Sequence, residues 1–183
     1  MPCGDCSGCC TSSYSIELRP GDAVALEQIP AKSLFRSRGS AAGNWTVRPN
    51  ADGTCPMLSC GSCRIYAQRP QTCLDYDCRV FAAAGIEAGG ADKAVINRRV
   101  REWRFRFSGE RERQEHAAIK AAAAFIRDAP EHFAPAIAPR NPLGIAALAL
   151  RVYPVFLPPG PPANAADAAR AILAAAAAFD RNV

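Results

Sequence analysis

The chain of 183 residues lacks the features that mark several common enzyme classes. Its only two histidines, His116 and His132, lie outside the cysteine-rich part of the chain, which disfavours a cysteine–histidine nucleophile pair. The sequence also has no Ser-His-Asp order, no phosphate-binding P-loop and no glycine motif for dinucleotides. These absences leave no standard catalytic motif.

Long hydrophobic runs are missing too. The longest, residues 145–150 and 171–179, fall well short of the roughly 20 residues that a membrane-spanning helix needs, so no membrane partner is expected. No secretory leader is evident at the N-terminus, which begins directly with cysteines and polar residues. We therefore expect a cytoplasmic protein.

Cysteine is absent after residue 78, and all nine cysteines lie between Cys3 and Cys78. Disulfides are one reading of this density, but nine is an odd number and the adjacent Cys9 and Cys10 are awkward to bridge. A reduced compartment also disfavours disulfides. Free cysteines often serve as small buried hydrophobes, yet that role accounts for one or two residues rather than nine. Metal binding is the better interpretation.

Four of the thiols fall in the first ten residues, in the segment Cys3-Gly-Asp-Cys6-Ser-Gly-Cys9-Cys10. Glycine, aspartate and serine fill the gaps between them, and these residues favour tight turns. A Cys-x2-Cys turn lets two thiolates converge on one soft cation, as in zinc and iron–sulfur sites. The segment therefore predicts a metal-binding turn.

A second group of thiols follows about 45 residues later: Cys55, Cys60, Cys63, Cys73 and Cys78. Two x2 turns, Cys3/Cys6 or Cys6/Cys9 with Cys60/Cys63, are compatible with a tetrahedral zinc site. Three close cysteines, Cys3, Cys6 and Cys9, with the remote Cys55-Pro56 are equally compatible with a four-iron cluster. The spacing alone does not choose between zinc and iron. Either arrangement would close long loops, so metal binding would stabilise the fold.

The full pattern resembles a known family. It comprises Cys3-x2-Cys6-x2-Cys9-Cys10, Ile16-Glu-Leu-x3-Asp22, Cys55-x2-Leu58, Cys63-x-Ile65-Tyr66-x2-Arg69-Pro70-x2-Cys73 and Cys78. This pattern is similar to the YkgJ-type cysteine-cluster family of zinc- or iron-chelating domains, and the helical remainder is similar to longer bacterial members.

The resemblance implies a metal-binding protein whose molecular role beyond chelation is open. The metal ligands that it implies are Cys3, Cys6, Cys9, Cys10, Cys55, Cys63, Cys73 and Cys78. Cys60 is an addition to the family pattern and is not among them. A relative of this domain occurs in a bacterial flagellin lysine methylase, so an iron–sulfur-dependent redox or methyl-transfer enzyme is the alternative, by analogy only. The cofactor is then zinc, iron or a [4Fe-4S] cluster.

Arg69 and Tyr66 fall within the second cysteine group. A site with many thiolates is strongly anionic, and hydrogen-bond donors around it normally compensate that charge. Arg69 is a candidate for this role, with a solvated arginine before a helix as the alternative. For Tyr66 we expect plain packing.

The net charge of +5 is carried by the second half of the chain. Residues 1–91 hold eight basic and eight acidic residues, whereas residues 92–183 hold 14 and nine. The arginines between Arg98 and Arg106 alternate with Trp103, Phe105 and Phe107, a pattern that can grip phosphates and stack bases. Interspersed glutamates favour a solvated face over buried aromatics, so a nucleic-acid partner is the weaker interpretation.

The expected fold is mainly α: an irregular, cysteine-rich metal-binding N-terminal part with a small β-hairpin, packed on about four helices. We expect a cysteine-cluster region over residues 1–80 and an alanine-rich helical region over 81–183, together forming one continuous domain. The predicted hairpin joins residues 45–48 to 54–58, after a strand within 14–18. Asp22 is expected to cap a helix over 23–28, and Pro70 to begin a helix that carries Cys73. Later helices are predicted over 91–103, 110–128, 142–155 and 165–179, with Asn141 and Asn164 as caps.

Overall fold

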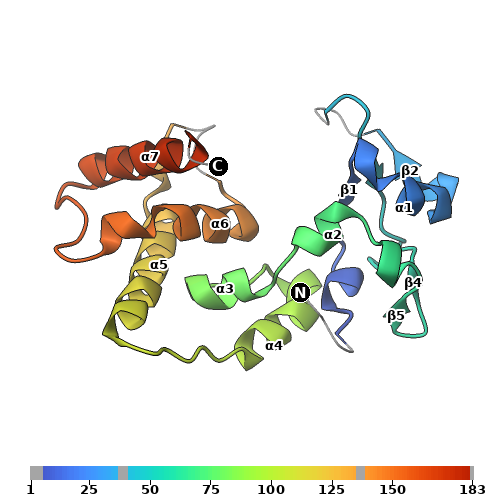
Figure 1. Cartoon of the computed structure of the whole chain (residues 1–183), viewed down its shortest axis with the longest axis horizontal. Helices are drawn as coiled ribbons and strands as arrows, with labels where there is room; N and C mark the ends of the chain where they lie inside the picture. Colours follow the sequence, from blue (N-terminus) through green and yellow to red (C-terminus); the bar gives the residue numbers. More distant parts are fainter. Residues whose placement is uncertain (1–5, 37–40, 135–138, 182–183) are drawn as a thin grey trace. The chain divides into compact units, whose positions relative to one another are not determined.

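The computed structural model describes residues 6–36, 41–134 and 139–181 (Figure 1). Cys3 is therefore outside the described residues. Most of the described chain is helical, and the strands are short, which confirms the predicted mainly α class with a small hairpin. In the described part the α-helices are α1 (Ala23–Gln28), α2 (Gln71–Asp75), α3 (Arg79–Ala84), α4 (Ala94–Glu102), α5 (Glu110–Asp128), α6 (Pro142–Val152) and α7 (Ala165–Arg181). The strands are β1 (Ile16–Leu18), β2 (Leu34–Phe35), β3 (Trp45–Val47), β4 (Leu58–Ser59) and β5 (Ser62–Cys63).

Two compact units make up the chain. The first consists of Met1–Asp77 and Gly89–Arg99, and the second of Cys78–Ala88 and Val100–Val183. Gly89–Arg99, which we assigned to the helical region, therefore belongs to the first unit. Cys78, which we assigned to the cysteine-cluster region, belongs to the second unit. The expectation of one continuous domain stays a prediction.

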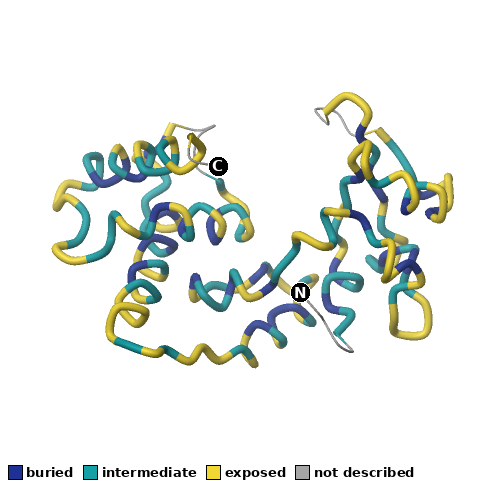
Figure 2. Tube along the Cα trace, in the orientation of Figure 1, coloured by how far each residue is buried: buried dark blue, intermediate teal, exposed yellow. Residues whose placement is uncertain are grey.

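The first unit is built on a three-stranded antiparallel sheet in the order β1-β3-β2. Ile16 of β1 and Leu34 of β2 both lie opposite Val47 of β3. Because side chains alternate along a strand, Leu18 reaches the same face as Ile16 and is buried. Buried residues from the sheet, α1 and the following loops form the core of this unit (Figure 2), namely Leu18, Ala25, Ile29, Val47, Cys55, Met57 and Ile65.

Two local predictions for this unit are wrong. Residues 54–58 do not pair with β3, whose two edges are taken by β1 and β2; the hairpin is formed by β4 and β5 instead. Asp22 precedes α1 but its side chain makes no cap bond to that helix. Its carboxylate accepts the backbone N–H groups of Arg19 and Gln71, at 2.8 Å each, so it joins α2 to the β1–α1 segment.

The second unit is a small helical assembly in which α5 and α6 pack together and α3 and α7 pack against α6. Its fully buried side chains include Phe81, Ile126, Val152 and Ile172. Helix α5 has the predicted bounds, and Asn141 caps α6 by accepting the N–H of Gly144 at 2.7 Å. Asn164 caps α7 in the same way, as predicted.

Arginines of the arginine-rich stretch bond to other groups of the chain. Arg101 pairs with Glu87 at 2.6 Å, and Arg104 donates to the carbonyl of Trp103 at 2.9 Å. After α4 the backbone is irregular; Trp103 and Phe107 are half-buried and Phe105 is exposed. His116 packs between the rings of Phe105 and Phe107, with centroids 5.1 and 5.0 Å away. Within the described ranges, no helix is both long enough and apolar enough to cross a bilayer.

Candidate metal centre

Cys9 and Cys10 of the first cysteine group lie in a single 3₁₀ turn, η1 (Gly8–Thr11). The N–H of Cys10 donates to the carbonyl of Ser7 at 2.9 Å, and the buried Ser12 hydroxyl donates to the carbonyl of Gly8 at 2.6 Å. A Cβ at Gly8 would lie 3.3 Å from the Ile96 side chain of α4, so this close approach favours glycine. Hydrogen bonds within the turn and the close approach to α4 therefore hold the backbone that carries Cys9 and Cys10.

The second group of cysteines reaches the first through a backbone contact. The N–H of Cys55 donates to the carbonyl of Cys10 at 2.7 Å, and the N–H of Ser13 donates to the carbonyl of Gly53 at 2.9 Å. These two bonds fasten the loop before β4 against the first cluster. Met57 accepts the N–H of Arg64 at 2.9 Å, which extends the pairing beyond β5.

The β4–β5 hairpin carries Cys60 and Cys63. Leu58 lies opposite Cys63, and the turn is Cys60-Gly61, with φ of +49° and +76°. Two successive residues at positive φ define the tight hairpin turn whose twist matches the strands, and glycine suits the second position. Cys60 is consequently an exposed turn residue, whereas Cys63 is half-buried.

Helix α2 supplies Cys73 and is anchored to β1. The hydroxyl of Thr72 donates to the carbonyl of Glu17 at 2.6 Å, and Arg19 forms an ion pair with Asp75 at 3.3 Å. Together with the Asp22 bond to Gln71, these contacts fix the helix that carries this thiol. Pro70 precedes α2 as its N-cap residue, one position before the predicted place.

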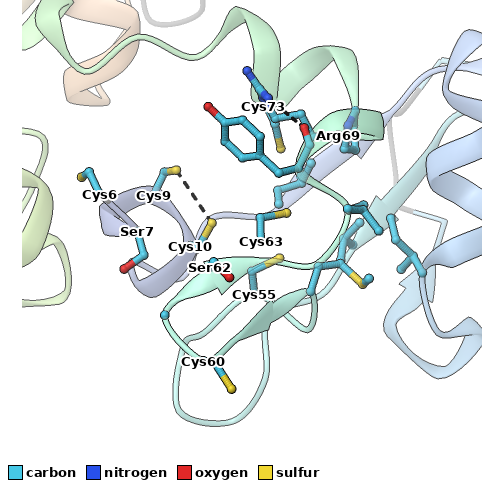
Figure 3. Close-up of a pocket in the computed structure, with 18 residues that line it drawn as sticks. Cys6, Ser7, Cys9, Cys10, Cys55, Cys60, Ser62, Cys63, Arg69 and Cys73 are labelled. Carbon is cyan, nitrogen blue, oxygen red and sulfur yellow. Dashed lines mark hydrogen bonds between the residues drawn. The ribbon is translucent and has the colours of Figure 1, made fainter. Parts of the chain in front are cut away.

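A cavity of about 440 Å³ in the first unit brings the cysteines together (Figure 3). The cysteines in its lining are Cys6, Cys9, Cys10, Cys55, Cys60, Cys63 and Cys73. Figure 3 shows the sulfurs of Cys9, Cys10, Cys55, Cys63 and Cys73 gathered between the first cysteine turn, the β4–β5 hairpin and α2, while that of Cys60 points away at the hairpin tip. We call these five the thiol cluster. The eight cysteines that the structure describes are all free thiols.

The thiols of the cluster shift one another's pKa values. The sulfurs of Cys9 and Cys10 are 4.0 Å apart. The hydrogen bond from the Cys10 thiol lowers the pKa of Cys9 to about 7 and raises the pKa of Cys10 far above its usual range. Burial raises the pKa of Cys73 to about 12, and the negative charges of Cys9, Cys55 and Cys63 add to this rise. Burial raises the pKa of Cys55 as well.

Arg69 is the one charged residue in the described lining of the cavity. Its guanidinium lies 4.1 Å from the centre of the Tyr66 ring and donates to the Tyr66 carbonyl at 2.8 Å. Its positive charge acts to lower the pKa values of Cys9 and Cys73. Arg69 is thus held at the cavity rather than extended into solvent, and Tyr66 serves as its platform although its own ring is exposed.

The donor set fits a thiophilic metal. Zinc–sulfur bonds of about 2.3 Å in a tetrahedron place the sulfurs roughly 3.8 Å apart, close to the 4.0 Å between Cys9 and Cys10. Among the residues that the structure describes, no three Cys, His, Asp or Glu side chains stand close enough to hold an ion as they are. Binding would therefore draw further thiols of the cluster toward the Cys9–Cys10 pair.

Two predicted ligands are not in this lining. Cys3 lies outside the described residues. Cys78 belongs to the second unit, where it is buried and its sulfur accepts the indole N–H of Trp103 at 3.5 Å. The ligand set as a whole stays a prediction.

Comparison with known proteins identifies the family. A family model described as "Putative zinc- or iron-chelating domain", named CxxCxxCC, matches residues 2–94. The chain belongs to the CxxCxxCC family. The match includes every cysteine of the chain, both those of the thiol cluster and Cys78, and it ends within α4. No curated protein and no solved structure matches the chain.

Membership of the CxxCxxCC family supports metal binding by zinc or iron and leaves the choice between them open. Sequence reasoning missed the apolar part of the cavity, which is formed by Ile16, Ile29, Val47, Met57 and Ile65. Ile16 and Ile65 occur in the family pattern, but the pattern does not mark them as cavity lining, because each of the five residues comes from a different strand or loop and only the folded unit assembles them.

Proposed function

We propose that this chain chelates zinc or iron through thiolates at the cavity of the first unit. The observation that carries the proposal is the convergence of five thiols from η1, the hairpin region and α2 on one cavity. The proposed ligands in this unit are Cys6, Cys9, Cys10, Cys55, Cys63 and Cys73, with Cys3 added from the sequence pattern. Cys78 remains a proposed ligand on sequence grounds.

Each part of the site has a distinct task in this proposal. The η1 turn offers a pair of thiols at nearly the spacing of a metal-bound pair, and the raised pKa values of Cys55 and Cys73 keep those thiols protonated until a metal displaces the protons. Arg69 offsets the negative charge that the thiolates acquire. A bound soft cation would supply the bonds that hold the three cysteine-bearing segments together.

A [4Fe-4S] cluster is the finer alternative, and with it an iron–sulfur-dependent redox or methyl-transfer enzyme. The size of the cavity favours this alternative, because about 440 Å³ lies within the range of pockets that hold small molecules. A structural or metal-handling role is supported by the thiols themselves. For a nucleic-acid role, the intramolecular pairing of Arg101 offers no support.

Metal analysis of the protein purified without oxygen tests the proposal. Zinc or iron bound through the cluster predicts thiolate-to-cobalt charge-transfer absorption when the stripped protein is titrated with Co²⁺. Visible absorption with equimolar iron and sulfide would select the iron–sulfur alternative. A folded, reduced protein that takes up none of these metals would overturn the proposal.

A further inference from the structure

The lining of the cavity that holds the thiol cluster is not made of sulfur alone. It includes aliphatic side chains from β1, β3 and neighbouring loops, which we call the aliphatic wall, namely Ile16, Ile29, Val47, Met57 and Ile65. Ser7, Ser62, Tyr66 and Arg69 add polar groups to the lining. Four of the five aliphatic residues are buried, and Ile16 is half-buried. The antiparallel register of β1 and β3 places Ile16 and Val47 opposite each other, so this wall is a continuation of the sheet face.

The aliphatic wall supplies no ligand to a bare metal ion. Carbon side chains cannot coordinate a cation, and they offer a water molecule no hydrogen-bond partner. A metal ion with its sulfur ligands also needs only a small part of about 440 Å³. For comparison, an apolar cavity of about 150 Å³ is large enough to bind benzene. The space beside the thiols is therefore suited to a hydrocarbon group.

We infer that the occupant of this cavity is a thiophilic metal or metalloid centre that carries a small hydrocarbon group, with the thiols binding the centre and the aliphatic wall binding the group. The inference rests on the proposed function, since it assigns a class of ligand to the same thiols. Cys9 and Cys10, with sulfurs 4.0 Å apart, are the pair placed to bind such a centre.

Organoarsenic(III) compounds are suitable probes because their chemistry with a thiol pair is fixed. A compound RAs(OH)₂ reacts with two thiols so that two As–S bonds form and two As–O bonds break. Each leaving hydroxide takes one thiol proton and departs as water, and arsenic stays trivalent, so no oxidant is involved. Phenyl- and methylarsonous acid share this reaction and differ only in the hydrocarbon group.

Calorimetry measures the affinity of the full chain for each probe, and the phenyl affinity is divided by the methyl affinity. The same ratio, measured with dithiothreitol in place of the protein, corrects for the intrinsic difference between the two probes in their reaction with thiols. After that correction we expect the phenyl probe to bind at least about tenfold more tightly than the methyl probe, since each buried carbon adds to binding. Equal corrected affinities would overturn the inference. Cobalt titration of the same sample reports separately on the proposed function, which stands if cobalt binds even when the two probes do not differ.

Two variants locate the effect. Ile16→Ala shortens the wall, whereas Leu26→Ala removes a similar side chain that packs on the same core but does not line the cavity. The phenyl preference should fall severalfold in Ile16→Ala and stay unchanged in Leu26→Ala. An equal fall in both variants, or none in either, would contradict the assignment of the wall. Ile16→Val, a milder truncation, provides the same comparison with less loss of core volume.

Discussion

The backbone N–H of Cys55 donates a 2.7 Å hydrogen bond to the carbonyl of Cys10. This bond joins two cysteine groups that are 45 residues apart in the chain, and it does so through backbone atoms that no cysteine pattern specifies. It leaves both side chains free to face the cavity, where both thiols belong to the cluster. The metal site is therefore partly organised by the fold before any metal binds.

The first prediction separates Cys63 from Cys60, the two cysteines of the hairpin. Cys63→Ser should weaken Co²⁺ or Zn²⁺ binding by at least about a hundredfold, because the loss of a metal ligand lowers the affinity more than the loss of a group that hydrogen-bonds to a ligand. Cys60→Ser should leave the affinity unchanged, because the Cys60 sulfur points away from the cluster. Competition with a chromophoric chelator measures both. Equal losses in the two variants would contradict the orientation of Cys60.

The second prediction concerns pH and the stability of the metal-free protein. Unfolded cysteine ionises near pH 9, whereas burial raises the pKa of Cys73 to about 12 in the folded chain. Because the folded state holds this proton more tightly, its contribution to stability is complete below pH 9 and is lost as the pH rises toward 12. The free energy of unfolding of the metal-free chain should therefore fall over this range, and more steeply than in Cys73→Ser.

Metal reverses the sign of that dependence. Zinc competes with protons for the thiols, so its apparent affinity should rise with pH between 6 and 8, and proton release should accompany binding. Denaturant titrations at several pH values, with and without zinc, measure both effects. Parallel stability curves for wild type and Cys73→Ser above pH 9 would contradict the burial of this thiol.

The third prediction tests Arg69 as the charge that offsets the thiolates. Arg69→Gln should weaken metal binding by about tenfold, in the range found when a partner beside a metal ligand is lost. Arg64→Gln is the matched control, since Arg64 is exposed and does not line the cavity. If the two variants bind metal equally well, Arg69 has only the surface role that the sequence also allowed.

The fourth prediction tests Asp22 as the link between α2 and the β1–α1 segment. Asp22→Ala leaves the N–H of Gln71 without its acceptor, so α2 and Cys73 should be less firmly placed and metal affinity should fall severalfold. Asp52→Ala is the control, because Asp52 accepts bonds from Thr54 in an exposed turn away from α2. Because these bonds are exposed and water can replace the lost acceptor, chemical denaturation should show a loss of only about 0.5–1.5 kcal/mol in Asp22→Ala.

Helices with a strong local signal could be predicted from the sequence. Glu110–Asp128 has helical spacing along its whole length, so the bounds of α5 were predictable. Asn141 is followed by proline at the first helical position, so the cap of α6 was predictable too. The cysteine pattern likewise predicted which residue type would gather at the site. The helix signals lie within a few residues of the feature they determine, whereas the cysteine pattern indicates chemistry without fixing which thiols meet.

Contacts between distant segments could not be predicted. From the sequence, the next extended segment after Trp45–Val47 is residues 54–58, and we predicted that the two pair. In the folded sheet, Trp45–Val47 pairs with β1 and β2 instead. Asp22 has the residue type of a cap, yet its carboxylate bonds to Gln71, 49 positions away. The aliphatic wall of the cavity depends on how the sheet and the neighbouring loops pack, and no spacing in the sequence marks its five residues as a group.

The central claim is that thiols from both cysteine groups bind one zinc or iron centre, and metal analysis of the chain purified anaerobically tests it most directly. We predict at least one equivalent of zinc or iron per chain, lost together with the stability of the first unit when a strong chelator is added, and lost equally in Cys10→Ser and Cys55→Ser. A chain that is metal-free as purified, binds no added metal and is equally stable with chelator would contradict the account.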